Sequence, residues 1–272
     1  MKPTLASLLA AFLVLFVTPF PSSAQILNGN MAPPFNTIAG DAANGSVANG
    51  WSAQGTADAN FIRNQSSTNS PFTSIYADNA SSAHIQDVES GSNTGALGYG
   101  FLQTFSTGFT DGSAGYDFMM QNFPSTGIVG VQFNNSGNIT GGSSATRLRF
   151  ELNNNGNLAF TTATATASPI LAITAGTWYH IAFSWDVSGA FTGSATAFGG
   201  ATSNFSGTLV PNAANNISGV QVRDRDENPA GDIYIDNIYV VPEPAPALML
   251  GMAAALGLLV LSRRKAQTLP IR

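Results

Sequence analysis

The chain has 272 residues, of which 9% are charged, and a formal net charge of −5. It contains no cysteine, which excludes disulfides, thiolate metal sites and a cysteine nucleophile. Residues 25–241 hold five arginines, no lysine and fourteen acidic residues, a net charge of −9. We therefore expect no nucleic-acid partner, because phosphate binding needs a positive surface.

The first 24 residues have the pattern of a cleavable secretion signal. Lys2 gives a positive start, residues 5–17 are almost wholly apolar, and residues 22–24 are small. This order is what signal peptidase reads. We predict cleavage between Ala24 and Gln25, with a retained membrane anchor as the alternative.

The C-terminal part of the chain combines a proline motif with an apolar run. Pro242, Glu243 and Pro244 are followed by the apolar residues 245–261. That run has the minimum length for a helix that crosses a membrane. We therefore predict one transmembrane helix there, immediately after the proline motif.

A basic cluster follows the predicted helix. Arg263, Arg264 and Lys265 stay in the cytoplasm under the positive-inside rule. This orientation places residues 25–241 outside the inner membrane and residues 266–272 in a cytoplasmic tail. The two ends of the chain thus predict the same topology.

The order of motif, helix and basic cluster resembles the PEP-CTERM sorting signal of Gram-negative bacteria. The resemblance covers about residues 241–265. It implies that Pro242-Glu243-Pro244 is recognised by an exosortase, a membrane cysteine protease-transpeptidase. The protein would then pass from the inner membrane to the cell surface or extracellular matrix. An ordinary single-pass anchor with a proline stalk is the alternative, and the tail 266–272 is longer than usual for the family.

Residues 25–241 read as one all-β domain, because short alternating segments are separated by turn residues. Leu148, Phe150 and Leu152 share one face of a strand, and the turn at 153–157 leads into a returning strand at 158–164. Further strands are expected in a sandwich. They are Phe72–Tyr76, Ala83–Val88, Gly98–Phe105, Gly115–Phe123, Val129–Phe133, Ile217–Arg223 and Asp232–Val241.

The segment 178–187 gives the strongest strand pattern. Its apolar face is expected to hold Tyr179, Ile181, Phe183, Trp185 and Val187. The opposite face is expected to hold His180, Ala182, Ser184 and Asp186.

Three segments resemble concanavalin A-like and laminin-G-like domains. Residues 176–186 are similar to their W-Y-H strand, and residues 188–198 to the hairpin that follows it. Residues 233–240 are similar to the last strand of jelly-roll carbohydrate-binding domains. The resemblance implies an antiparallel β-sandwich of the jelly-roll type.

Candidate catalytic groups are few. Retaining glycoside hydrolysis needs two carboxyl groups about 5–5.5 Å apart, and Asp87 with Glu89 is an alternate pair that more often forms a solvated edge. His180 beside Ser184 and Asp186 suggests a His–Asp relay or, more simply, a hydrogen-bonded surface histidine. We therefore expect no catalytic residues.

Two further sets of residues suggest ligands. Asp224, Asp226 and Glu227 are a candidate calcium loop, although Arg223 and Arg225 offer self-neutralisation and the EF-hand pattern is absent. Four aromatic residues are candidates for sugar stacking or for the core. They are Trp51, Tyr76, Tyr99 and Tyr116.

The expected function is that of a non-enzymatic surface or extracellular-matrix protein associated with exopolysaccharide. The alternatives are a carbohydrate-binding module with a defined sugar site, and a divergent glycoside hydrolase of concanavalin A-like fold. No cofactor is expected, apart from the alternative of a structural calcium ion. The processing partners are signal peptidase and the exosortase.

Replacing Pro242-Glu243-Pro244 by three alanines tests the sorting signal. Proline fixes φ and keeps the preceding residue extended, which is the conformation a protease binds. We expect the variant to stay membrane-bound and unprocessed, measured by cell fractionation and by mass spectrometry of the C-terminus. Unchanged release of the protein from the membrane would show that no exosortase recognises the motif.

Overall fold

The computed structural model describes eleven stretches of the chain. They are residues 51–54, 61–65, 68–73, 82–86, 99–123, 128–135, 146–153, 156–162, 168–211, 216–224 and 232–242. The predicted cleavage site at Ala24 and Gln25 lies outside these stretches, as do residues 243–272, which include the predicted transmembrane helix and the basic cluster. Within the described stretches, no helix has the length and apolar character that crossing a membrane requires.

The described residues form fourteen strands. In chain order they are β1 (Trp51–Gln54), β2 (Phe61–Gln65), β3 (Ser82–Gln86), β4 (Tyr99–Phe109), β5 (Gly112–Asn122), β6 (Ile128–Asn134), β7 (Thr146–Asn153), β8 (Asn157–Thr161), β9 (Ser168–Ala172), β10 (Trp178–Trp185), β11 (Ala190–Ala197), β12 (Thr202–Thr208), β13 (Ile217–Asp224) and β14 (Asp232–Pro242).

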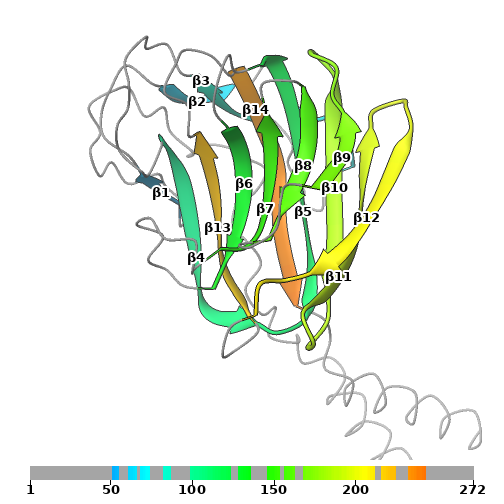
Figure 1. Cartoon of the computed structure of the whole chain (residues 1–272). Coiled ribbons are helices and arrows are strands. Elements are labelled where there is room, and N and C mark those ends of the chain that lie inside the picture. The colour runs from blue at the N-terminus through cyan, green and yellow to red at the C-terminus, as the bar shows by residue number, and fades with distance from the viewer. Residues whose placement is uncertain are drawn as a thin grey trace, which may run out of the picture.

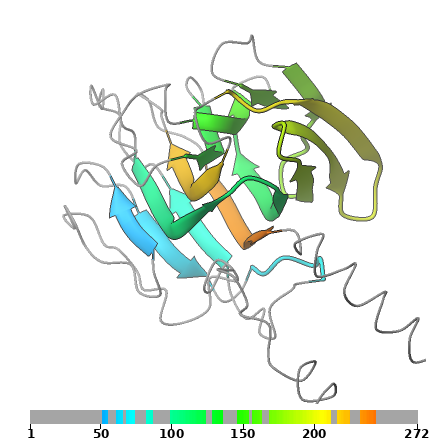
Figure 2. The same ribbon diagram turned by 90° about the horizontal axis from the view of Figure 1, so that it is seen from below.

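The strands make two seven-stranded sheets that pack as layers (Figures 1 and 2). Sheet 1 has the order β1-β4-β13-β6-β7-β8-β9, and sheet 2 the order β12-β11-β10-β5-β14-β3-β2. The strand pairs are antiparallel, as in β10 with β5 and β14 with β5. The prediction of an all-β antiparallel sandwich is confirmed.

Strand β10 shows how alternation builds the inner face of sheet 2. Tyr179, Ile181 and Phe183 are at most 3% exposed and point toward sheet 1, while the residues between them point away. The strand ends at Trp185, and the chain turns at Asp186, whose carboxylate accepts a hydrogen bond from the Ser188 backbone at 2.8 Å. The prediction that Val187 shares the buried face was therefore wrong, since Val187 is 66% exposed.

The predicted hairpin of β7 and β8 is confirmed. Leu148, Phe150 and Leu152 are at most 3% exposed on one face of β7. Strand β8 pairs antiparallel with β7 after a turn in which Gly156 has φ of +73°. A residue with a side chain rarely adopts that backbone conformation.

Aromatic rings join the two sheets. The Phe150 ring of sheet 1 lies 5.5 Å from that of Phe183 and 6.0 Å from that of Tyr116 on sheet 2. Trp51, 1% exposed, packs edge-on against Phe101 at 5.0 Å. Trp51 and Tyr116 therefore belong to the core and not to a sugar-stacking surface.

The expected strand at Phe72–Tyr76 was wrong in its described part. Phe72 lies in a bend, and residues 68–73 form no strand. This segment runs over the outer face of sheet 2, where the backbone N–H of Ser70 donates to Asp236 and its hydroxyl donates to Asp117. These hydrogen bonds hold the segment in place of the backbone pairing of a β-strand that the sequence pattern predicted.

Phe150→Ala should lower the free energy of unfolding by about 3–5 kcal/mol, since it removes a ring buried between the sheets and leaves a cavity. Chemical denaturation at neutral pH measures the change. Val187→Ala, at a site 66% exposed, is the control and should stay within about 0.5 kcal/mol of the parent protein. Equal losses in both variants would contradict this account of the core.

Candidate functional site

A row of polar residues crosses the outer face of sheet 2. Asp236 on β14 lies directly opposite Asp117 on β5, which lies opposite His180 on β10. The row continues to Thr196 on β11 and Thr202 on β12. Residues directly opposite in an antiparallel pair share one face of the sheet. Five adjacent strands thus contribute one polar side chain each.

His180 and Asp117 form the centre of this row. Nδ1 of His180 lies 2.6 Å from Oδ1 of Asp117. The side chain of Asp117 is 1% exposed, whereas that of His180 is 29% exposed. The bond at Nδ1 fixes the orientation of the ring, so that Nε2 is the nitrogen that a ligand can meet.

Asp117 receives two more hydrogen bonds. The hydroxyl of Ser70 donates to Oδ2 at 2.5 Å, and the side-chain amide of Asn237 donates to the same oxygen at 2.7 Å. Buried carboxylates require such donors, because their desolvation is otherwise costly. Asp117 is therefore held as a buried, hydrogen-bonded anion that orients His180.

Asp236 is the second carboxyl group of the row. It accepts hydrogen bonds from the backbone of Ser70 at 3.1 Å and of Asn237 at 2.8 Å. Burial, and then the nearby charge of Asp117, raise its pKa to about 8, whereas the two backbone bonds act to lower it. Burial and Asp117 also raise the pKa of Tyr239, further along β14. At neutral pH Asp236 is consequently largely protonated.

The segment 68–72 is tied over this row. The hydroxyl of Ser82 donates to the Thr68 carbonyl at 2.5 Å, and Ser70 bonds to both carboxyl groups. The ring of Phe72 lies 5.4 Å from the His180 ring and 5.5 Å from that of Phe198. The ring of Phe72 therefore borders His180, and the ring of Phe198 packs against Phe72.

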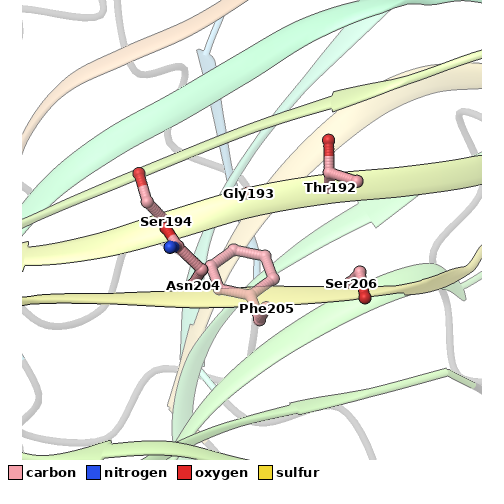
Figure 3. A pocket seen from close by; sticks show the side chains of 6 residues that line it. All are labelled: Thr192, Gly193, Ser194, Asn204, Phe205 and Ser206. Carbon is pink, nitrogen blue, oxygen red and sulfur yellow. The ribbon is translucent and has the colours of Figure 1, made fainter.

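A shallow depression of about 460 Å³ lies on β11 and β12. Figure 3 shows the residues that line it. Its lining residues are uncharged. They are Thr192, Gly193, Ser194, Asn204, Phe205 and Ser206. Ser194 is opposite Ala182, two residues from His180 on β10, so the depression and the imidazole are neighbours on the same face.

The second histidine forms a different pair. The ring of His84 stacks on Tyr234 with centroids 4.3 Å apart, and its Nε2 lies 3.2 Å from Asp232 Oδ1. Asn122 donates to the other oxygen of Asp232 at 2.8 Å. His84 is only 9% exposed, so this pair ties β3 to β14 and offers less access than His180.

The sequence identified His180 but not its partner. Asp186 does not reach His180, because its Oδ1 is bonded by the hydroxyl of Ser188 at 2.6 Å within the turn. The partner is Asp117, 63 residues earlier in the chain. A single aspartate between Tyr116 and Phe118 in a strand otherwise rich in apolar residues was the available signal.

The remaining predicted site residues are only partly described. Pro242 ends β14 opposite Gly112, while Glu243 and Pro244 lie outside the described stretches. Asp224 ends β13. Asp226, Glu227, Asp87 and Glu89 lie outside the described stretches. No group of three or more histidine or acidic side chains in the described part of the chain is arranged to hold a metal ion. The calcium and sorting sites stay predictions.

No family model and no curated protein matches the chain in sequence. Among solved structures, it is similar to an alginate lyase from Aplysia kurodai, with 13% identity, 67% of this chain and 87% of that chain covered, and a TM-score of 0.46. It is also similar to an endo-β-1,4-glucuronan lyase from Trichoderma reesei, with 13% identity, 74% and 94% covered, and a TM-score of 0.48. A carbohydrate esterase from a Shiga toxin-encoding bacteriophage gives 14% identity, 77% and 98% covered, and a TM-score of 0.44.

These structures correct the expectation of a non-enzymatic surface protein. All three are carbohydrate-processing enzymes, which contradicts the expectation that the protein is not an enzyme. The expectation of no catalytic residues stays a prediction. At such identities and TM-scores the likeness concerns the fold. The role of each residue must therefore come from the geometry of this chain.

The raised pKa of Asp236 predicts a pH dependence of stability. The group is protonated in the folded protein up to a pH of about 8 but ionises near 3.8 when unfolded. The folded state therefore binds more protons than the unfolded state between these values, and the free energy of unfolding falls as the pH rises. The slope from this group is at most about 1.4 kcal/mol per pH unit.

Asp236→Asn should remove this component, measured by urea denaturation between pH 4 and pH 8. Asp186→Asn, in an exposed turn, is the matched control and should keep the fall. An identical pH slope in the Asp236→Asn variant and the parent protein would show that Asp236 does not titrate as described.

Proposed function

We propose that the protein is an exported, carbohydrate-active enzyme that binds a saccharide chain across β10, β11 and β12 and uses His180 to transfer a proton. One observation carries the proposal. The partly exposed His180 has its Nδ1 held at 2.6 Å by the buried Asp117. An imidazole oriented in this way is suited to act as a general base and then as a general acid.

Buried Asp117 supplies what such a histidine needs. Its negative charge stabilises the imidazolium that forms when Nε2 takes a proton. Ser70 and Asn237 hold the carboxylate in place, so it does not have to reorganise during the reaction. His84 lacks this combination, because it is less exposed and its Nε2 is directed to Asp232.

The depression beside His180 supports a saccharide as the ligand. Thr192, Ser194, Asn204 and Ser206 offer hydroxyl and amide groups that both donate and accept hydrogen bonds. A polyhydroxylated chain matches such a lining. An open surface on adjacent strands also suits a polymer, since it leaves both ends of the chain outside the site.

The charges around His180 favour a neutral saccharide. Asp117 lies in its own row, and an anionic sugar would meet the negative field of this carboxylate. The arginine side chains that the structure describes, Arg147 and Arg149, lie on β7 of the other sheet. They are not positioned to neutralise an anion at His180.

Export and sorting are part of the proposal. The apolar N-terminal segment and the Pro242-Glu243-Pro244 motif support passage through the inner membrane and recognition by an exosortase. The destination would be the cell surface or extracellular matrix, where polysaccharide is available as a substrate. Low charge density on residues 25–241 is compatible with that setting.

His180→Gln should lower kcat for a neutral polysaccharide by about 10²–10⁴-fold. His84→Gln is the matched control and should keep turnover, since the chain has two histidines and only one faces the depression. Products are followed by chromatography of digests, and circular dichroism verifies folding.

Binding is tested separately with Asn204→Ala, which removes an amide from the depression. We expect weaker retention on an immobilised neutral polysaccharide, whereas Val187→Ala should bind as the parent protein does. Equal turnover in the His180→Gln and His84→Gln variants would contradict the assignment of His180.

A further inference from the structure

We infer that the bond cleaved at His180 is an O-acyl ester on a neutral saccharide, so that the reaction removes an acyl substituent and leaves the sugar chain intact. The inference rests on the proposed function and names its substrate class. Four features of the described residues carry it: the inaccessibility of both carboxyl groups, the charges near His180, a pair of hydroxyl groups beside the imidazole, and an aromatic border next to it.

Cleavage of the glycosidic bond does not fit the carboxyl groups. Glycoside hydrolysis uses two carboxyl groups that flank the scissile bond. Asp117 is 1% exposed and Asp236 is 0% exposed, and Ser70, in the segment that runs over the outer face of sheet 2, bonds to both of them. Neither oxygen pair can reach a sugar, and His180 is left as the accessible titratable group of the row.

Elimination from a uronate does not fit the charges. That reaction begins with removal of the proton next to a carboxylate, which requires the carboxylate charge to be neutralised. His180 is bonded to the carboxylate of Asp117, and the described arginine side chains lie on sheet 1. An ester carbonyl is neutral and needs only a base and hydrogen-bond donors.

Thr196 and Thr202 supply the donors. Thr196 is directly opposite His180, and its hydroxyl lies 2.9 Å from that of Thr202. One hydroxyl of such a pair donates to the other, so the second keeps its hydrogen for another acceptor. Either hydroxyl can be the donor, and in both arrangements one hydrogen remains available to an oxygen that becomes negative during acyl transfer.

Phe72 and Phe198 supply the border for the acyl group. Phe198 is 55% exposed and shares this exposure with Val187 among the described large apolar side chains. Its ring meets that of Phe72 edge-on at 5.5 Å, and Phe72 in turn lies 5.4 Å from the His180 ring. A small apolar substituent such as an acetyl methyl group fits against these rings, whereas a hydrated sugar hydroxyl gains less from them.

The reaction balances with water as the only co-reactant. Nε2 of His180 takes a proton from water as the water oxygen bonds to the ester carbonyl carbon, giving a tetrahedral intermediate. The bond from that carbon to the sugar oxygen then breaks, and Nε2 returns the proton to the sugar oxygen. The products are a carboxylic acid and a free sugar hydroxyl, with no change in oxidation state.

The test uses the full chain with acetylated glucomannan, and the same polymer deacetylated with alkali as the control substrate. Released acetate and new reducing ends are measured in parallel. We expect the parent protein to release acetate from the acetylated polymer without forming new reducing ends. The rate of acetate release should fall by about 10²–10⁴-fold in His180→Gln and stay unchanged in His84→Gln. Thr196→Val should lower kcat by about 10²-fold with little change in KM, and Phe198→Ala should raise KM.

The outcomes separate this inference from the proposed function. New reducing ends that depend on His180, without acetate, would overturn the ester assignment and leave the proposed function standing. Binding of the polymer without either product would overturn both. Acetate release that persists unchanged in His180→Gln would also overturn the inference, because the ester would then be cleaved elsewhere.

Discussion

The outer face of sheet 2 is organised by one constraint, the burial of a negative charge at Asp117. A carboxylate that is 1% exposed is stable only if donors replace its water. Here the donors come from three places in the chain: His180 on β10, Asn237 on β14, and Ser70 in the segment that runs over the sheet. The same bonds therefore fix the imidazole, join neighbouring strands, and hold that segment in place.

Asp236 extends this constraint to a second carboxyl group. Two ionised carboxylates on directly opposite residues would repel, and the raised pKa of Asp236 avoids that repulsion by keeping the proton. The backbone of Ser70 bonds to Asp236 while its hydroxyl bonds to Asp117. The position of the segment 68–72 is thus coupled to the protonation of Asp236. Through Ser70 and Asp117 it is also coupled to the environment of His180.

Local patterns predicted much of the fold and little of the site. Alternation in β7 and β10 identified their buried faces, because a strand's period is visible within a few residues. Strand order was not visible, since it depends on which distant segments pack together. The partner of His180 shows the consequence: Asp186 was close in sequence, but the fold brings Asp117 from β5. The alternation of polar residues in β10 indicated the face on which His180 lies. Only the pairing of β10 with β5 identified Asp117 as its carboxylate partner.

The bulge at Asn237 explains how core and site coexist on one strand. Asp236 is opposite Asp117 and Tyr239 is opposite Gly115, so β14 has one more residue than β5 between these pairs. Asn237 takes up the extra residue with φ of 51°, a conformation that asparagine tolerates better than most residues. Ile235 and Ile238 therefore both remain buried in the core, although an unbroken strand would place them on opposite faces. The bulge gives the site two consecutive polar residues, and it does so without moving an apolar side chain out of the core.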